Sequence, residues 1–236
     1  MRISVALDPA EIALLPKRDL SHTTCVVFDV LRATSSMVTA LAHRTAEIHP
    51  VCTIEEAHDA KLRMPGAVLG GERQGNRIEG FDIGNSPSEY RDLAGRAIIT
   101  TTTNGTVALR ACEQAETVMI GALLNIAALA DELRWREPEA LLLVCAGTFE
   151  DFALEDAYAA GVLTAALPDA QLADSAHAAL AVAKLFPTPI AALRAARNGR
   201  ALAASGRAED VDWCAQVSRF NVIGIMDHAV IRPLEA

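Results

Sequence analysis

The feature that most constrains this chain is a pattern that occurs three times. An apolar run is followed by a cluster of small polar or charged residues and then by a helix-like stretch, over residues 26–34, 98–106 and 142–149. Continuous apolar runs rich in β-branched residues are typical of strands buried on both faces of a parallel sheet. Ligands bind at the carboxyl ends of such strands, where helix N-termini direct N–H groups at anions. The pattern therefore predicts one polar pocket.

Strand-like and helix-like segments alternate along most of the chain. We expect strands near residues 2–7, 24–30, 46–51, 67–70, 97–101, 117–120, 141–145 and 221–226. We expect helices over residues 34–42, 53–64, 106–114, 125–136, 155–167, 176–186, 190–204 and 209–220. This alternation predicts an α/β fold, with a mainly parallel or mixed sheet covered by helices in α/β/α layers. No change of composition marks a linker, so residues 1–236 form a single compact unit or two closely packed lobes.

The charge and composition of the chain exclude several classes of partner. The formal net charge is −9 and no block of five basic residues occurs, so we expect no nucleic-acid partner. No segment is long and apolar enough to cross a bilayer, and residues 1–7 lack a signal-peptide layout. Five scattered cysteines without a CxxC pair argue against disulfides and a zinc cluster. We therefore expect a cytoplasmic protein without membrane contact, and a homodimer only as the commonest oligomer.

Acidic residues with a site-like setting occur at strand ends and in a long loop. Asp29 ends a buried run, where it can bind Mg²⁺ or act as nucleophile or base, or else only cap a helix. Residues 71–87 predict a long polar loop, a length that is usually functional or disordered. In it, Glu72 and Arg73 can supply a metal ligand and an anion clamp, and Asp82 adds a carboxylate. The segment 70–75 matches neither the dinucleotide-binding nor the P-loop pattern.

A threonine-rich segment is the second candidate for anion binding. Thr100 to Thr103 are followed by Asn104-Gly105-Thr106 where a strand gives way to a helix. Hydroxyls and free helix N–H groups there can cradle an anion, although β propensity, an Asn-Gly turn and a Thr106 cap explain part of the pattern. Arg32 can form a two-pronged contact to a phosphate or sulfonate. Asn85 is either a turn residue or a ligand.

Taken together, these blocks resemble the 2-phosphosulfolactate phosphatase family, the ComB-type phosphatases associated with coenzyme M biosynthesis. The matching segments, in the family's order, are residues 28–35, 71–73, 80–87, 101–106, 145–147 and 154–156, with Gly161 behind them. The resemblance implies a Mg²⁺-dependent phosphatase that hydrolyses phosphosulfolactate to sulfolactate and phosphate, so its partner is a small anionic phosphorylated substrate.

The resemblance also implies roles for particular residues. Carried over by position, the metal ligands are Asp29, Glu72, Asp82 and Asp156. The catalytic residues are Asp29, Arg32, Glu72 and Asp82, and the substrate-binding residues are Arg73, Asn85, Thr103, Asn104, Gly105 and Thr106.

Two questions stay open at the level of sequence. Either a metal-bound water or Asp29 attacks phosphorus, and the sequence does not choose between them. A haloacid-dehalogenase phosphatase is disfavoured because Leu31 stands where that class requires a second Asp. The alternative functions are a phosphatase for another small phosphorylated hydroxy acid and a non-catalytic module that binds small anions.

Overall fold

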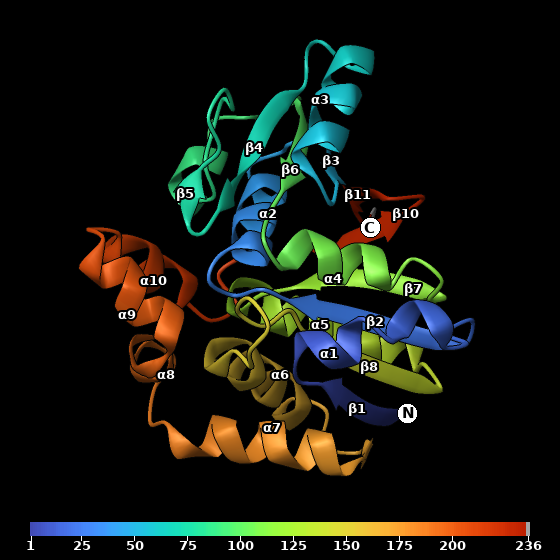
Figure 1. The fold of residues 1–236 in the computed structure, drawn as a ribbon. Helices are drawn as coiled ribbons and strands as arrows, with labels where there is room; N and C mark the ends of the chain where they lie inside the picture. The colour runs from blue at the N-terminus through green and yellow to red at the C-terminus, as the bar shows by residue number, and fades with distance from the viewer. Residues whose placement is uncertain (235–236) are drawn as a thin grey trace.

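The elements of the fold alternate along the chain, as the sequence predicts. The computed structural model describes residues 1–234 (Figure 1). Its strands are β1 (Arg2–Ala6), β2 (Thr23–Phe28), β3 (Glu47–Pro50), β4 (Val68–Arg73), β5 (Asn76–Arg77), β6 (Ala97–Thr101), β7 (Thr117–Gly121), β8 (Ala140–Cys145), β9 (Gln171–Leu172), β10 (Gly224–Asp227) and β11 (Val230–Pro233). Its helices are α1 (Pro9–Ile12), α2 (Ala33–Ala42), α3 (Ile54–Arg63), α4 (Gly105–Ala111), α5 (Ile126–Arg136), α6 (Leu154–Ala165), α7 (Asp174–Leu185), α8 (Pro189–Ala195), α9 (Arg197–Ala204) and α10 (Ala208–Cys214).

One mixed sheet of eleven strands runs through the residues described, in the order β5-β4-β6-β3-β11-β10-β7-β2-β8-β1-β9. It contains two groups of parallel strands: β7, β2, β8, β1 and β9 form one group, and β4, β6 and β3 form the other. The hairpin β10–β11 joins them and pairs antiparallel with β7 on one side and β3 on the other. The two groups therefore run in opposite directions. The α/β prediction, with a mixed sheet, is confirmed.

Helices cover both faces of the larger group of strands. Val26 and Phe28 of β2 belong to the core shared with α5, α6 and α7, whereas Cys25 and Val27 belong to the core shared with α1, α2 and α4. Alternate side chains of a strand point to opposite faces, so a strand buried on both faces must be apolar throughout. This is why β2 reads as a continuous apolar run. A third core lies between α3 and the smaller group of strands.

Local signals at the helix ends behave as the sequence predicts. Thr53 is the N-cap of α3, and its hydroxyl accepts the Glu56 N–H at 3.0 Å. Half of the capping box from Ser86 to Glu89 is also present, because the Glu89 carboxylate accepts the Ser86 N–H at 3.1 Å at the start of a single 3₁₀ turn over Pro87–Tyr90. Such caps satisfy N–H groups that have no partner within the helix, which fixes where the helix begins.

Four expectations about the elements are wrong in detail, and one of them is the predicted helix over 209–220, which ends at Cys214 as α10. The predicted loop over 71–87 starts late, because β4 continues to Arg73 and turns into β5, with Glu72 opposite Arg77. The predicted helix over 190–204 is two helices, since the chain is extended at Ala196 and α9 folds back on α8. Gly199 permits this close packing, because a Cβ there would overlap the Leu193 carbonyl. Strand β11 has no counterpart among the predicted strands.

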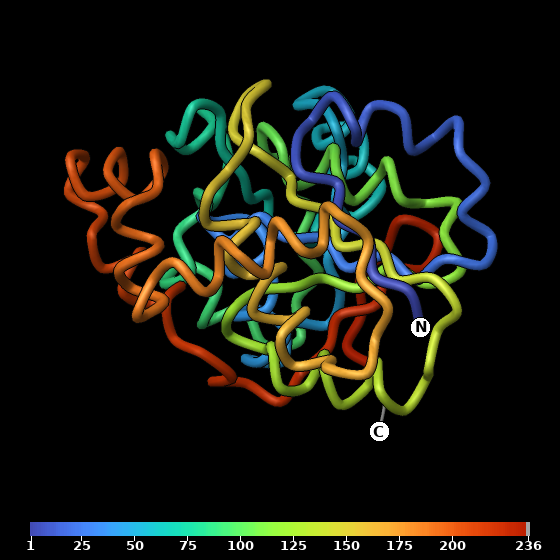
Figure 2. The backbone as a smooth tube through the Cα atoms, turned by 90° about the horizontal axis from the view of Figure 1, so that it is seen from below, coloured from blue at the N-terminus to red at the C-terminus, as the bar shows by residue number. Residues whose placement is uncertain are grey.

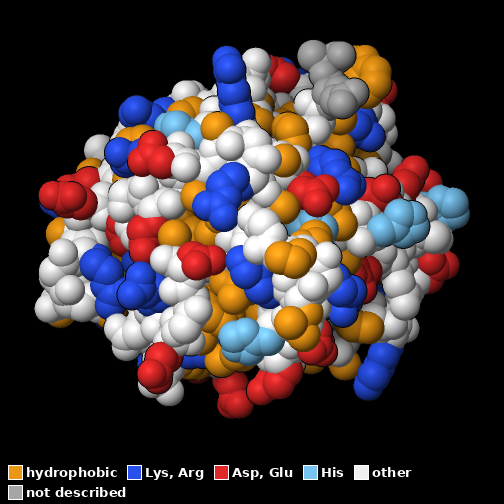
Figure 3. Space-filling view, turned by 90° about the horizontal axis from the view of Figure 1, so that it is seen from above, with side chains coloured by type: hydrophobic (Ala, Val, Ile, Leu, Met, Phe, Trp, Pro, Cys, Tyr) orange, Lys and Arg blue, Asp and Glu red, His pale blue; other side chains and the backbone are white. Residues whose placement is uncertain are grey.

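The helices α8, α9 and α10, residues 189–214, form a helical arm that lies at one side of the molecule in both views (Figures 1 and 2). No single helix within residues 1–234 has the length and hydropathy to cross a membrane. Helices α7 and α8 have that length and hydropathy only when taken together, and they are bent by 103° relative to each other. On the face shown in Figure 3, acidic and basic side chains are interspersed.

Candidate active site

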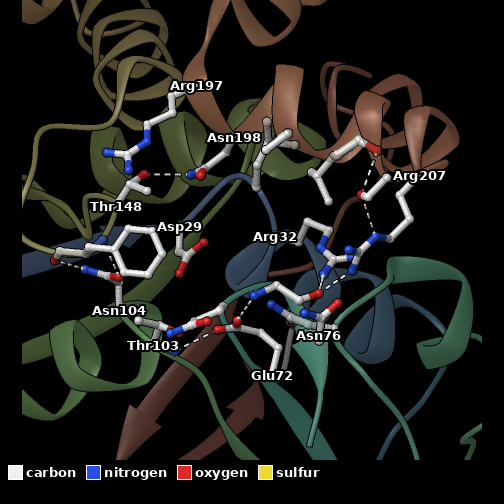
Figure 4. A pocket seen from close by; sticks show the side chains of 18 of the residues that line it. Asp29, Arg32, Glu72, Asn76, Thr103, Asn104, Thr148, Arg197, Asn198 and Arg207 are labelled. Atoms are coloured by element: carbon white, nitrogen blue, oxygen red, sulfur yellow. Dashed lines mark hydrogen bonds between the residues drawn. The ribbon is translucent and has the colours of Figure 1, made fainter.

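A cavity of about 460 Å³ lies where the loops after β2, β4, β6 and β8 meet the helical arm (Figure 4). Its lining comes from Asp29, Leu31, Arg32, Glu72 and Asn85, from residues 74–76, 103–104 and 147–149, and from the arm between residues 197 and 207. The predicted convergence of the three repeated strand-end segments is thus observed, because each contributes residues to this one pocket.

Asp29 follows directly after β2 and lies inside the pocket. Its Oδ1 accepts the Ala33 N–H of α2 at 3.1 Å, and its own N–H donates to the Thr34 hydroxyl at 3.0 Å. Burial raises the pKa of Asp29 to about 7, and the nearby charges of Glu72 and Glu155 act in the same direction. Gly105 begins α4 beside it, and a Cβ there would lie 2.5 Å from Oδ2 of Asp29. Gly105 therefore supports the site by leaving room for the carboxylate.

Glu72 joins two of the converging loops. It is 7% exposed, and its two carboxylate oxygens accept the N–H groups of Thr103 at 2.7 Å and of Gly75 at 2.6 Å. These bonds fix the turn after β4 against the loop after β6. Glu72 thus has a structural role, and it also presents a second carboxylate to the pocket, near Asp29.

Two buried oxygen atoms of the pocket residues lack a partner. Oδ1 of Asn85 and Oγ1 of Thr103 have no hydrogen bond within residues 1–234. Buried polar atoms are nearly always hydrogen-bonded, so these two indicate a place for a ligand, an ion or water. Mg²⁺ favours oxygen donors, with one or two carboxylates and the remainder from water and substrate. The carboxylates of Asp29 and Glu72 and the unpartnered oxygens of Asn85 and Thr103 fit that requirement. A cluster of three His, Cys, Asp or Glu side chains that could hold a metal is absent from the described part of the chain, so a metal here would depend on these mixed oxygen donors.

The arginines of the pocket come from two parts of the chain. Arg32, which is 4% exposed, pairs with Asp210 of α10 at 2.6 Å, and Asp210 also accepts the Ser86 hydroxyl at 2.5 Å. Arg207 lines the pocket from the turn before α10. Arg197 lies at the start of α9, where it pairs with Asp151 at 2.9 Å. These side chains give a pocket with two carboxylates a positively charged wall.

Sequence reasoning missed the arm and the turn it faces. Asn198 donates to the Thr148 hydroxyl at 2.7 Å and to Glu155 at 2.6 Å, which ties α9 to the loop after β8. Burial raises the pKa of Glu155. The one local signal was the triplet Arg197-Asn198-Gly199, which interrupts an alanine-rich run. Thr148 lies in the repeated segment 142–149, where nothing in the sequence distinguishes it as a site residue.

Two of the predicted metal ligands lie outside the pocket lining. The carboxylate of Asp156 accepts the N–H groups of Val30 at 2.8 Å and Gly147 at 3.1 Å, so it holds two loops together from behind. Burial raises the pKa of Asp156 well above its usual range. Asp82 is exposed and accepts the Leu69 N–H at 2.8 Å, with Lys61 at 3.9 Å. The structure therefore does not bring these two carboxylates into the pocket lining, and their assignment as metal ligands stays a prediction.

The predicted anion binders also divide into two sets. Asn85, Thr103 and Asn104 line the pocket, whereas Arg73 and Thr106 do not. Arg73 follows Glu72 in a strand, so its side chain points the other way, and it donates to the Thr101 hydroxyl at 2.9 Å.

Backbone contacts occupy two side chains of the threonine-rich segment. The Thr106 hydroxyl accepts the Thr102 N–H at 3.1 Å and donates to the carbonyl of the same residue. The Asn104 amide donates to the Ala146 and Phe149 carbonyls at 3.1 and 2.8 Å, which leaves it a positioning role for the loop after β8.

The fold and the pocket define the class: an α/β protein with a polar, arginine-lined site at the carboxyl ends of parallel strands. Within it, the chain belongs to the 2-phosphosulpholactate phosphatase family, whose sequence model matches residues 11–229. It is 37% identical over 226 residues to the probable 2-phosphosulfolactate phosphatase of Carboxydothermus hydrogenoformans, covering 94% of this chain and 92% of that one. It is 42% identical over 218 residues to the protein of the same name from Deinococcus radiodurans, covering 90% of each. The resemblance found in the sequence is thus confirmed.

Proposed function

We propose that this protein hydrolyses 2-phosphosulfolactate to sulfolactate and phosphate with Mg²⁺ as cofactor, a reaction of the coenzyme M biosynthesis type. The family supports the reaction, and the observation that carries it is the half-buried Asp29 carboxylate that shares one small pocket with arginines. The substrate bears a phosphate, a carboxylate and a sulfonate. A chain of net charge −9 can bind so dense an anion only through local cations and N–H groups.

The residues that would hold Mg²⁺ are Asp29, Asn85 and Thr103, with Glu72 beside them. The unpartnered oxygens of Asn85 and Thr103 support this assignment. When bound, the ion would supply neutralisation of the phosphoryl charge.

Asp29 is the reacting group in this proposal. Without a bound cation, burial holds the pKa of Asp29 near 7, so the carboxyl exchanges its proton at neutral pH; a Mg²⁺ ion beside it would favour the ionised form, which is the form that attacks phosphorus or accepts a proton from water. In one route an ionised Asp29 oxygen bonds to phosphorus as the ester P–O bond breaks, and the sulfolactate oxygen takes a proton from water. Water then hydrolyses the aspartyl phosphate, which releases phosphate and restores Asp29. In the other route Asp29 takes a proton from the water that attacks phosphorus and passes it to the sulfolactate oxygen as the ester P–O bond breaks. In both routes Arg32 orients the anion, and the buried Asp210 holds Arg32 in place.

The first experiment measures phosphate release from a panel of phosphorylated hydroxy acids with Mg²⁺, and again after chelation. We expect the fastest turnover on 2-phosphosulfolactate, loss of turnover on chelation and recovery when Mg²⁺ is added back. Faster turnover on another member would identify the alternative substrate. Tight binding of these anions without any turnover would instead identify a non-catalytic anion-binding module.

A second experiment separates the two routes. Acid quench during turnover of phosphorus-labelled substrate traps a phosphoenzyme if Asp29 attacks phosphorus, and the label disappears in Asp29→Asn. Asp82→Asn is the matched control, since Asp82 lies outside the pocket lining. An unlabelled wild-type enzyme under fast turnover would support attack by water.

The five cysteines are all free thiols. Thiols persist in reducing compartments, which supports the further proposal that the enzyme works in the cytoplasm.

A further inference from the structure

Two guanidinium groups meet at one edge of the pocket. Arg32 donates to the Gly75 carbonyl at 3.2 Å, and Arg207 donates to the same oxygen. The two arginines lie 43 and 132 residues from Gly75 in the sequence, so the fold itself brings them together. Figure 4 shows the two groups side by side, on the opposite side of Asp29 from Thr148 and Asn104.

The charges of this pair are only partly balanced. Asp210 pairs with Arg32, whereas Arg207 has no carboxylate within ion-pair distance in residues 1–234 and contacts only the Ser205 hydroxyl and the Gly75 carbonyl. Asp210 balances the charge of Arg32, so the charge of Arg207 faces the pocket without an ion-pair partner, while the pocket carboxylates Asp29 and Glu72 hydrogen-bond to backbone N–H groups. Like charges at such close range repel each other, and an anion placed between them removes that penalty. The geometry therefore points to an oxyanion subsite.

The chemistry of the substrate indicates which anion belongs there. A carboxylate suits Mg²⁺ as a ligand, so an ion held by Asp29, Asn85 and Thr103 would favour the substrate carboxylate on that side of the pocket. A sulfonate stays ionised at all working pH values and has three oxygens, and two guanidinium forks can approach those oxygens from two directions. Arg197 is a weaker candidate for this role because its side chain is 58% exposed, so water screens its charge.

We propose that Arg32 and Arg207 form the sulfonate subsite, and that Arg207 determines the preference for sulfonated substrates. The proposal rests on the proposed function, because it assigns the phosphate end to Asp29. It adds a selection rule to that function: substrates without a second, permanently ionised oxyanion do not engage Arg207.

The test compares kcat/KM of Arg207→Gln on 2-phosphosulfolactate and on 2-phospholactate, which lacks the sulfonate. We expect the preference for the sulfonated substrate to fall by about 10–100-fold, as the loss of a charge-assisted contact predicts. Arg207→Lys, which keeps the charge but not the fork, should lie between the wild type and Arg207→Gln. Arg200→Gln removes an exposed charge from α9, the neighbouring helix of the arm, outside the pocket lining and should leave the preference unchanged.

A binding measurement makes the result independent of turnover. Titration with sulfolactate and with lactate should show a wild-type preference for sulfolactate that Arg207→Gln loses. Equal affinity of both proteins for sulfolactate, or equal kinetic loss on both substrates, would overturn the subsite. If the wild type hydrolyses no member of the panel yet shows this binding pattern, the proposed hydrolysis fails and the subsite stands.

Discussion

The two walls of the pocket differ in how their side chains are held. The sheet-edge wall consists of Asp29, Glu72, Asn85 and Thr103, which are short, and backbone hydrogen bonds fix both carboxylates. The arm wall consists of Arg197, Asn198 and Arg207, which reach the pocket from a separate layer of helices. Reacting groups need exact placement, and a rigid strand end supplies it, whereas recognition of charge tolerates longer side chains. The comparison teaches that chemistry and recognition are assigned to different parts of this fold.

The sharpest test of that division is Asp29→Asn, for which we expect the largest effect. If the sheet-edge wall carries the chemistry, kcat should fall by about 10⁴-fold, the upper end of what one acid–base group contributes. Steady-state phosphate release measures this effect. A loss of kcat no larger than that caused by Arg207→Gln would contradict this division, because the two walls would then contribute equally to the chemical step.

The same variant should be more stable than the wild type at neutral and higher pH. The raised pKa of Asp29 means that the folded state resists ionisation, so wild-type stability falls as pH rises from about 4 to about 7. Asp29→Asn removes this loss, and above pH 7 its free energy of unfolding should rise by up to about 3 kcal/mol after allowance for screening by pocket water. Denaturant unfolding at pH 4 and pH 8 checks it, and the two proteins should agree at pH 4.

Asp210→Asn tests the buried ion pair that joins Arg32, in the loop after β2, to Asp210 of α10 in the helical arm. This change leaves Arg32 buried without its counter-charge, and removing one partner of a buried pair costs about 3 kcal/mol or more. Thermal or denaturant unfolding measures the loss. Asp212→Asn on the same helix breaks only the exposed pair with Arg194 and should cost under about 1 kcal/mol. A similar loss of unfolding free energy for both variants would show that the Arg32–Asp210 ion pair does not hold the arm against the loop after β2.

The smallest effect is expected for Asp82→Asn. Asp82 lies outside the pocket lining, so kcat/KM should change by less than about threefold, within the usual range of a surface substitution. Steady-state kinetics at several Mg²⁺ concentrations measures it. A shift in the Mg²⁺ concentration that the variant requires would show that Asp82 contributes to metal binding.

The sequence predicts the sheet-edge wall well because local signals encode it. The apolar runs of β2, β6 and β8 mark strand ends, and Asp29, Thr103 and Asn104 follow those ends directly. It does not anticipate that Arg73 and Asp82 lie outside the pocket lining, because a motif fixes spacing along the chain and not the direction of a side chain. Arg73 points away since it follows Glu72 in a strand.

The arm wall could not be predicted for a different reason. Its helices are alanine-rich and pack by shape, and the contacts that bring Arg207 to Gly75 span 132 residues. No local pattern records such a contact. Only the folded chain shows that a segment of ordinary composition closes the pocket.

The hairpin β10–β11 has a consequence for how this protein is made. It occupies the middle of the sheet although it comes from residues 224–233, after every other strand has been synthesised. While the ribosome is still extending the chain, the two opposed groups of strands each expose an unpaired edge, and such edges invite pairing with other chains. The sheet can therefore be completed only after this hairpin has emerged from the ribosome, so co-translational folding of both groups of strands depends on residues 224–233.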